Sequence, residues 1–369
     1  MQEIDERKLK NPVAGTDSLG ERSIQVGWKR ILPHLFPQAV RRLLVEHNEM
    51  RSEIQRLQVA HCELQRLHVQ YETIERTLLL QGQLASHTIS KTATLGTLAD
   101  TEFQVFSQWG EDGIIEWLVS HVAVPNNRFI EFGVENFTEA NCRFLMQNRN
   151  WKGLVFDGNE DYMAGLRKHR LFWMYDLTAK AAFITAENIN DLILEAGFGG
   201  PLGILSIDID GNDYWVWKAI NVVDPAIVIC EYNPILGDQH AVTVPYDPEF
   251  HRFKGHHSGL YFGASIAALK HLAEQKGYTF VGTNSNGINA FFVRRDLAGP
   301  VLARLQEIRA FCSRHRDSRD EKGELSFVGG RARFDLIRNC PFIDVETGAT
   351  LPLEKMGEPY SLGWKQEID

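Results

Sequence analysis

The sequence has few cysteines, and no two of them form a CxxC pair. The five residues are Cys62, Cys142, Cys230, Cys312 and Cys340, so they are scattered and odd in number. This pattern argues against a disulfide framework and against a zinc site. Reduced thiols of this kind are typical of a cytosolic protein.

Long apolar runs are also missing, and no stretch could span a bilayer as a helix. The first ten residues, MQEIDERKLK, are charged and lack the apolar core of a signal peptide. We therefore expect a cytoplasmic protein with no transmembrane segment, which would reach a membrane only through its partners. The net charge of −9, from 39 basic and 48 acidic residues, argues against a general nucleic-acid binder.

Proline and glycine are absent from residues 38–81, and this absence predicts one long helix. Apolar residues recur along it mostly at spacings of three and four, which is the pattern of a coiled-coil seam. The seam consists of Met50, Ile54, Leu57, Leu64, Leu67, Tyr71, Ile74 and Leu78. Because a lone helix would expose this stripe to water, we expect a homo-oligomer formed through it. The alternative is a helix folded back onto its own catalytic domain.

Strands and helices alternate beyond this helix, which predicts a mostly parallel sheet with helices on both faces. The predicted strands are residues 128–132, 153–156, 171–174, 203–209, 226–230, 278–281 and 290–293. The last two are joined by the turn Asn284-Ser285-Asn286-Gly287, so they form an antiparallel hairpin at one edge. Seven strands with an antiparallel last member are typical of the Rossmann-like class I methyltransferase fold.

These patterns divide the chain into five parts. We predict a flexible segment (1–37), a coiled-coil helix (38–81), a linker of small and polar residues (82–101), a catalytic domain (102–300) and an extension packed on it (301–369). In the extension only one helix, residues 301–313, is predicted.

Three acidic residues lie at the end of the apolar run in GILSIDIDGNDY, residues 203–214: Asp208, Asp210 and Asp213. Ligands of open α/β sheets bind just beyond the carboxyl ends of the strands, so Asp208 is placed where chemistry occurs. Closely spaced carboxylates repel one another unless a positive group lies between them, and a divalent cation is the simplest candidate. The alternative is a solvated Asp/Asn/Gly turn.

The first predicted strand leads into IEFGVENF, which lacks the later glycines of a GxGxxG motif. A ligand without phosphates suits this turn better than a dinucleotide, and Gly133 lets the backbone approach it closely. Glu131 could face a cationic part of that ligand. Asp157, at the end of the second strand, could accept hydrogen bonds from ribose hydroxyls. Asp176 is assigned to the end of the third strand, beside an adenine ring.

The fifth strand ends in Glu231-Tyr232-Asn233 and is expected to run beside the Asp208 strand. Asp208 or Asp210, together with Glu231 and Asn233, would then form an oxygen-ligand metal site. Without a metal, Asp210 could act as the general base. The histidine-rich segment 237–259 reads as a substrate-covering loop and offers His256 and His257 as further candidates.

Several segments resemble FkbM-like S-adenosylmethionine-dependent methyltransferases of bacterial polysaccharide and O-antigen biosynthesis. They are FSQWGEDGII (106–115), IEFGVENFTEAN (130–141), WKGLVFDGN (151–159), LSIDIDGNDYWVW (205–217), ICEYNP (229–234), YFGAS (261–265), GTNSNGINAFFVR (282–294) and SRDEKGELSF (318–327). The resemblance does not include the coiled coil. It implies S-adenosylmethionine as the methyl donor, with Glu131, Gly133 and Asp157 at cofactor-binding positions and Gln108 beside the methionine end.

The related macrolide sugar O-methyltransferases hold Mg²⁺ on aspartates after the fourth and fifth strands. Asp208 and Asp210 match the first of these positions. The second position reads Glu-Tyr-Asn here in place of paired aspartates, so this sequence departs from the pattern.

The leading hypothesis is O-methylation of a sugar hydroxyl on a bacterial glycan or its precursor, with Mg²⁺ as an assisting ion. The coiled coil would gather catalytic domains or tether them to a glycan-assembly protein. One alternative is a metal-dependent glycosyltransferase that uses the DxD sequence at 208–210. Another is an inactive methyltransferase-like scaffold.

Overall fold

The computed structural model describes residues 38–368, and for Ala39 and Val40 it describes the backbone alone. The chain divides into two compact units, Met1–Glu75 and Arg76–Asp369. The flexible segment predicted over residues 1–37 lies outside the described residues. Within the described range no helix is long and apolar enough to cross a membrane.

The long helix α2 runs from Gln38 to Ile89, eight residues beyond its predicted end at Gln81. Gly82, which suggested a linker, instead allows close packing of the helix. A Cβ atom at this position would lie 2.5 Å from Val105 and 2.6 Å from Phe144. Ser86 then donates a hydrogen bond of 2.6 Å to Glu116 of α3 (Glu111–His121). Residues 82–101 are therefore part of the second compact unit, with Leu95 and Leu98 among its buried residues.

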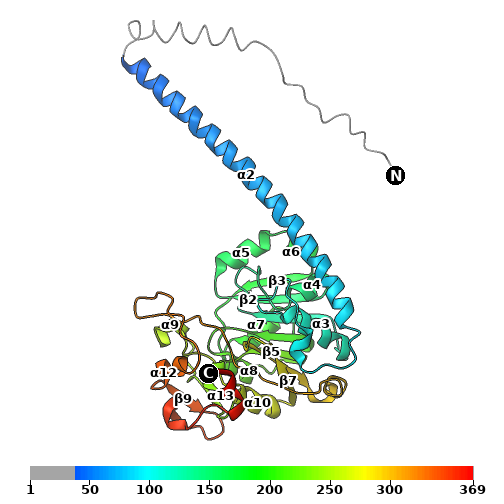
Figure 1. The fold of residues 1–369 in the computed structure, drawn as a ribbon. Coiled ribbons are helices and arrows are strands. Elements are labelled where there is room, and N and C mark those ends of the chain that lie inside the picture. The colour runs from blue at the N-terminus through cyan, green and yellow to red at the C-terminus, as the bar shows by residue number, and fades with distance from the viewer. Residues whose placement is uncertain (1–37, 369) are drawn as a thin grey trace, which may run out of the picture. The chain divides into compact units, whose positions relative to one another are not determined.

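The second unit is built on a seven-stranded sheet of order β3-β2-β1-β4-β5-β8-β7 (Figure 1). The strands are β1 (Arg128–Phe132), β2 (Lys152–Asp157), β3 (Leu177–Ala181), β4 (Gly200–Ile207), β5 (Val223–Glu231), β7 (Tyr278–Thr283) and β8 (Asn289–Arg294). The first five strands in chain order are parallel, and β8 is antiparallel to both β5 and β7. The predicted Rossmann-like fold is confirmed.

Helices pack on both faces of the sheet, as the alternation of strands and helices predicts. One face holds α3, α4 (Arg143–Arg149) and α5 (Glu160–Lys168). The other holds α7 (Ile189–Glu195), α8 (Asp213–Ala219) and α10 (Ile266–Gln275). Successive strand residues point to opposite faces, so Phe129 belongs to the first core cluster and Ile130 to the second.

Two predicted elements are wrong. Residues 171–174 form the short helix α6 (Leu171–Met174) in place of the third strand, which is instead β3. A short apolar run does not distinguish a strand from a helix, and here Trp173 is 79% exposed, as no residue of a doubly covered strand would be. The predicted helix 301–313 shrinks to α11 (Gly299–Leu302), because the chain beyond it is held by backbone pairing with Leu95 and Thr283.

The C-terminal extension adds a three-stranded sheet of order β10-β9-β6. Its strands are β6 (Val242–Thr243), β9 (Pro341–Asp344) and β10 (Thr350–Pro352), so β6 joins the extension to the loop after β5. The remaining helices are α9 (Arg252–Gly255), α12 (Ala332–Ile337) and α13 (Leu362–Ile368).

Candidate active site at the carboxyl edge of the sheet

Two cavities open where the parallel strands end. The first has a volume of about 380 Å³ and includes Glu131, Asp208 and Glu231 in its lining. The second has a volume of about 400 Å³ and includes Asp157 and, again, Asp208. Asp208 therefore lies at the junction between them, directly after β4, as the sequence placed it.

The turn after β1 takes its shape from Gly133, whose φ of +72° falls in the left-handed region that glycine adopts without strain. Its backbone N–H donates to the carbonyl of Phe156 at 3.0 Å, which ties the turn to the end of β2. Gly133 lines both cavities. The predicted close approach of backbone to a ligand thus has the conformation it needs.

Glu131 is buried at the end of β1, facing the start of the following segment. Its two carboxyl oxygens accept hydrogen bonds from the backbone N–H groups of Asn141 at 2.6 Å and Cys142 at 3.0 Å. Burial raises its pKa to about 7, and those hydrogen bonds only partly offset the effect. The carboxyl group therefore changes its charge near neutral pH.

Asp157 closes β2 with both oxygens oriented by the backbone. Oδ2 accepts from Glu135 N–H and Oδ1 from Asn159 N–H, each at 2.8 Å. The aromatic residues Phe156 and Phe183 line the same cavity. A carboxylate beside an apolar slot is the arrangement expected for a nucleoside, whose ribose donates and whose base packs.

Asp176 does not lie at this site. Because β3 begins at Leu177, Asp176 precedes the strand and lies where the parallel strands begin, away from the cavities. There its Oδ2 lies 3.1 Å from Lys152 Nζ. The residues that follow β3 toward the cavity are Ala182, Phe183 and Ile184. The misplaced third strand caused this error.

Gln108 lines the first cavity, and its predicted place beside the methionine end of a donor stays a prediction. The loop that carries it is fixed by the buried Asp112, whose Oδ2 accepts three backbone N–H groups from Val105, Phe106 and Ser107 at 2.7–2.9 Å. Trp109 follows in the same lining.

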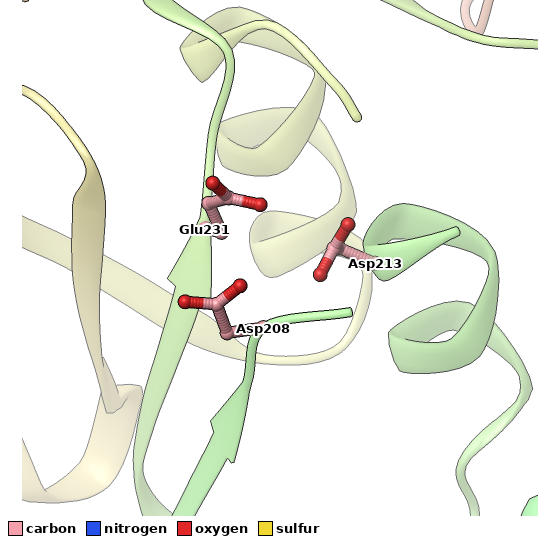
Figure 2. Close-up of side chains that lie close together, drawn as sticks. All are labelled: Asp208, Asp213 and Glu231. Atoms are coloured by element: carbon pink, nitrogen blue, oxygen red, sulfur yellow. The ribbon is translucent and has the colours of Figure 1, made fainter. Parts of the chain in front are cut away.

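Three carboxyl groups converge between β4, α8 and β5: Asp208, Asp213 and Glu231 (Figure 2). One oxygen of each lies within 4.8 Å of the others. Asp213 also accepts from the N–H groups of Ile209 at 2.8 Å and Gly211 at 2.9 Å. Glu231 Oε2 is buried and has no hydrogen-bond partner among the described residues.

The electrostatics of this cluster follow from burial and mutual repulsion. Burial, and then the neighbouring carboxylates, raises the pKa of Asp208 and of Glu231 well above their ordinary values. Burial also raises the pKa of Asp213 to about 6, while its backbone hydrogen bonds act in the opposite direction. A cation bound between the three groups would relieve both costs.

This set differs from the predicted metal ligands at two positions. Asp210 points to Arg252, with 2.6 Å between its Oδ1 and the guanidinium Nη1. Asn233 is fully engaged within the fold: its amide donates to the carbonyls of Leu260 and Phe262 at 2.9 Å, and its oxygen accepts from Ile235 N–H at 3.1 Å. Asp213 takes the third place because α8 begins at that residue.

The candidate bases His256 and His257 line neither cavity. Their rings pack on each other with centroids 4.3 Å apart, and His256 Nδ1 lies 2.8 Å from the Ser258 hydroxyl. The histidine in the first cavity is His315, whose ring meets Trp109 edge to face at 5.6 Å.

Sequence reasoning missed His315 and Arg333 of the C-terminal extension, and it missed Arg252 of the covering loop. These residues lie outside the quoted motif segments and do not follow a predicted strand, so no pattern pointed to them. Only the basic character of the stretch HRFKGHH could have drawn attention to Arg252.

No family model matches the chain, and among curated proteins no significant match was found. Among solved structures there are distant matches. An S-adenosylmethionine-dependent methyltransferase from Clostridium acetobutylicum is 10% identical, covers 50% of this chain and 89% of its own, and has a TM-score of 0.31. An O-methyltransferase from Bacillus cereus in complex with SAH is 12% identical, covers 58% and 79%, and has a TM-score of 0.31. The CurJ carbon methyltransferase is 10% identical, covers 60% and 70%, and has a TM-score of 0.32.

Proposed function

We propose that this protein is an S-adenosylmethionine-dependent O-methyltransferase that acts on a sugar hydroxyl of a bacterial glycan or its precursor. The observation that supports it most is the pair of cavities that meet at Asp208. Asp157 and Phe183 suit an adenosine in the second cavity. The turn at Gly133 brings the methionine part toward Glu131 and the first cavity, which is left for the acceptor.

The chemistry asks little of the protein beyond placement and one proton transfer. The acceptor oxygen forms a bond to the methyl carbon while the carbon–sulfur bond of the sulfonium breaks. In the metal-free protein the hydroxyl proton passes to the ionised form of Asp208, whose raised pKa makes it a stronger base than an exposed aspartate. Asp208 at the junction of the cavities is well placed for this role, while Asp210 is held by Arg252.

The carboxyl cluster also fits a divalent cation such as Mg²⁺. Asp208, Asp213 and Glu231 supply the hard oxygen ligands that this ion prefers, and the unpartnered Oε2 of Glu231 is accounted for by such a ligand. When bound, the ion would lower the pKa of an acceptor hydroxyl.

The helix α2 is proposed to form a homo-oligomer. In the described part of the first unit the seam residues Met50, Ile54, Leu57 and Leu64 are 48–65% exposed, so none of them is covered by that part of the chain. Self-association would bury this stripe and gather several catalytic units, or tether them to a glycan-assembly protein.

Calorimetric titration of the purified protein with S-adenosylmethionine and S-adenosylhomocysteine, in Mg²⁺ and in EDTA, tests the proposal. We expect micromolar binding that Asp157→Ala abolishes. Absence of donor binding in every condition would refute methyl transfer. Binding of a nucleotide sugar instead would favour the glycosyltransferase alternative.

A further inference from the structure

Arg333 of α12 is a buried cation in the wall of the first cavity. The residue is only 5% exposed, yet it is part of the cavity lining. All of its hydrogen bonds go to backbone carbonyls: Nη1 to His315 at 2.7 Å, Nη2 to Ser313 at 2.5 Å and Nε to Gly330 at 3.4 Å. These acceptors are neutral, so they orient the guanidinium without cancelling its charge.

No carboxylate lies within ion-pair distance of Arg333 in the part of the chain that the structure describes. Four other charged residues of the lining or beside it form ion pairs with one another. Arg252 pairs with Asp210, and Asp317 pairs with Arg319 at 2.9 Å. Burial lowers the pKa of the Arg333 guanidinium, which is the direction expected for a cation that lacks compensation. A buried charge without a counter-ion is costly, and such groups are usually paired.

The guanidinium also has donors to spare. It carries five N–H groups, and the three carbonyls use one on each nitrogen. One N–H therefore remains on Nη1 and one on Nη2. These two N–H groups can donate to the oxygens of a carboxylate or phosphate.

We propose that Arg333 binds an anionic group, a carboxylate or a phosphate, on the methyl acceptor. The substrate is then an acidic sugar or a sugar phosphate, and a neutral sugar is a poor ligand. This inference rests on the proposed function for its assignment of the first cavity to the acceptor. A purely structural Arg333, which only holds the carbonyls of residues 313–330, is the competing explanation.

Matched pairs of small ligands test the inference on the wild-type protein. Methyl glucuronide is compared with methyl glucoside, and glucosyl phosphate with glucose, by ligand-detected NMR titration with and without S-adenosylhomocysteine. We expect at least one anionic probe to bind about tenfold or more tightly than its neutral partner. The pair that shows the difference identifies carboxylate or phosphate as the source. Equal affinities within both pairs would overturn the proposal.

Variants separate binding from structure. Arg333→Gln should remove the preference for the anionic probe and leave affinity for S-adenosylhomocysteine unchanged. Arg331→Gln is the matched control, because Arg331 lies two residues away, pairs with Glu358 on the surface and does not line the cavity. Anion affinity that survives in Arg333→Gln would overturn the proposal, and a lowered melting temperature in that variant would then assign Arg333 a structural role. Should Arg333→Gln not fold, the wild-type pairs decide the question alone.

The two proposals fail in different ways. If the protein binds the anionic probe but not S-adenosylmethionine, the anion site is supported and the proposed methyl transfer is refuted. If the protein binds the donor and shows no preference for the anionic probe, the proposed methyl transfer is supported and the proposed role of Arg333 is refuted.

Discussion

A Cβ atom on Gly133 would lie 1.7 Å from the backbone carbonyl oxygen of Asp208. The turn after β1 and the acidic turn after β4 are therefore in direct backbone contact, since the two strands are neighbours in the sheet. The residue proposed to bring in the donor and the residue proposed to accept the proton are positioned by the same contact.

The first prediction concerns Gly133→Ala. It should destabilise the protein by several kcal/mol, because the new methyl group requires the two turns to separate and the left-handed φ adds roughly 1–2 kcal/mol of strain. Gly197→Ala is a matched control: it has the same φ of +72° and no atom within 4 Å of the added Cβ, so it carries the strain alone. Urea unfolding measures both, and equal losses would show that the contact with Asp208 has no energetic weight.

The second prediction is a pH dependence. The pKa of Glu131 is about 7 in the folded protein and near 4.5 unfolded, so the folded state binds more protons between these values. Stability from this group is complete below pH 4.5 and falls as pH rises to 7, by about 3 kcal/mol at about 1.4 kcal/mol per unit. Glu131→Gln has no ionisable group at this position, so it should lack this pH-dependent loss of stability.

Urea unfolding at several pH values checks the pH effect. Between pH 4.5 and 7.5 the wild type should lose about 3 kcal/mol more stability than Glu131→Gln. Asp112, Asp208, Asp213 and Glu231 also have raised pKa values and contribute to the slope in both proteins, so only the difference between the proteins is assigned to Glu131. Parallel curves for the two proteins would contradict the assignment.

The positions that sequence reasoning placed well all follow strands that read clearly. Glu131, Asp157, Asp208 and Glu231 come at the ends of apolar runs buried on both faces, and the edge at which parallel strands end is set by topology alone. The prediction for Asp176 was wrong because the short apolar run Leu171–Met174 is a helix that leaves Trp173 exposed. No local pattern separates a strand from a helix when the apolar run is this short.

Which side chains meet at the site was less predictable than where the site lies. Asp208, Asp210 and Asp213 are all aspartates close together in the sequence, so the sequence does not show which of them meet Glu231. In the structure Arg252 pairs with Asp210, and Asp213 joins the cluster instead. Arg333 lies on α12 of the C-terminal extension, far along the chain from the strands that form the site, so only the tertiary fold could place it in the cavity. Coupling over such separations has no signature in a single sequence.

The third prediction separates Asp157 from Asp176. Asp157→Asn should weaken S-adenosylmethionine binding by roughly 10- to 100-fold, since hydrogen bonds to a charged group are worth about 1.5–3 kcal/mol. Asp176→Asn, at the opposite edge of the sheet, should leave donor affinity unchanged. Calorimetry gives both values, and a matching loss in Asp176→Asn would indicate a general effect on folding.

The fourth prediction concerns the metal. Mg²⁺ should raise the melting temperature of the wild type relative to EDTA, because it removes the repulsion among Asp208, Asp213 and Glu231. Glu231→Gln should lose most of this response. Asp210→Asn is the control, since that side chain is 57% exposed and pairs with Arg252. A response that is the same in all three proteins, or missing in the wild type, would exclude this cluster as the binding site.

The last prediction is that the seam of α2 holds the oligomer together. Replacing Leu57 and Leu64 by Asp puts charges at two seam positions, where burial against a second helix would be costly, so the protein should become monomeric. Val59 and Val69 are as exposed, at 66% and 62%, but lie off the seam, so the same double change there should leave the oligomer intact.

Light scattering after size-exclusion chromatography reads the mass of each variant. A difference between the two pairs assigns the interface to one face of the helix, which general loss of hydrophobicity could not do. A monomeric wild type would mean that the exposed stripe is covered by a different partner. Because all four substituted positions lie in the unit before residue 76, donor binding by the second unit should survive in every variant, and its loss would show that the catalytic unit depends on association.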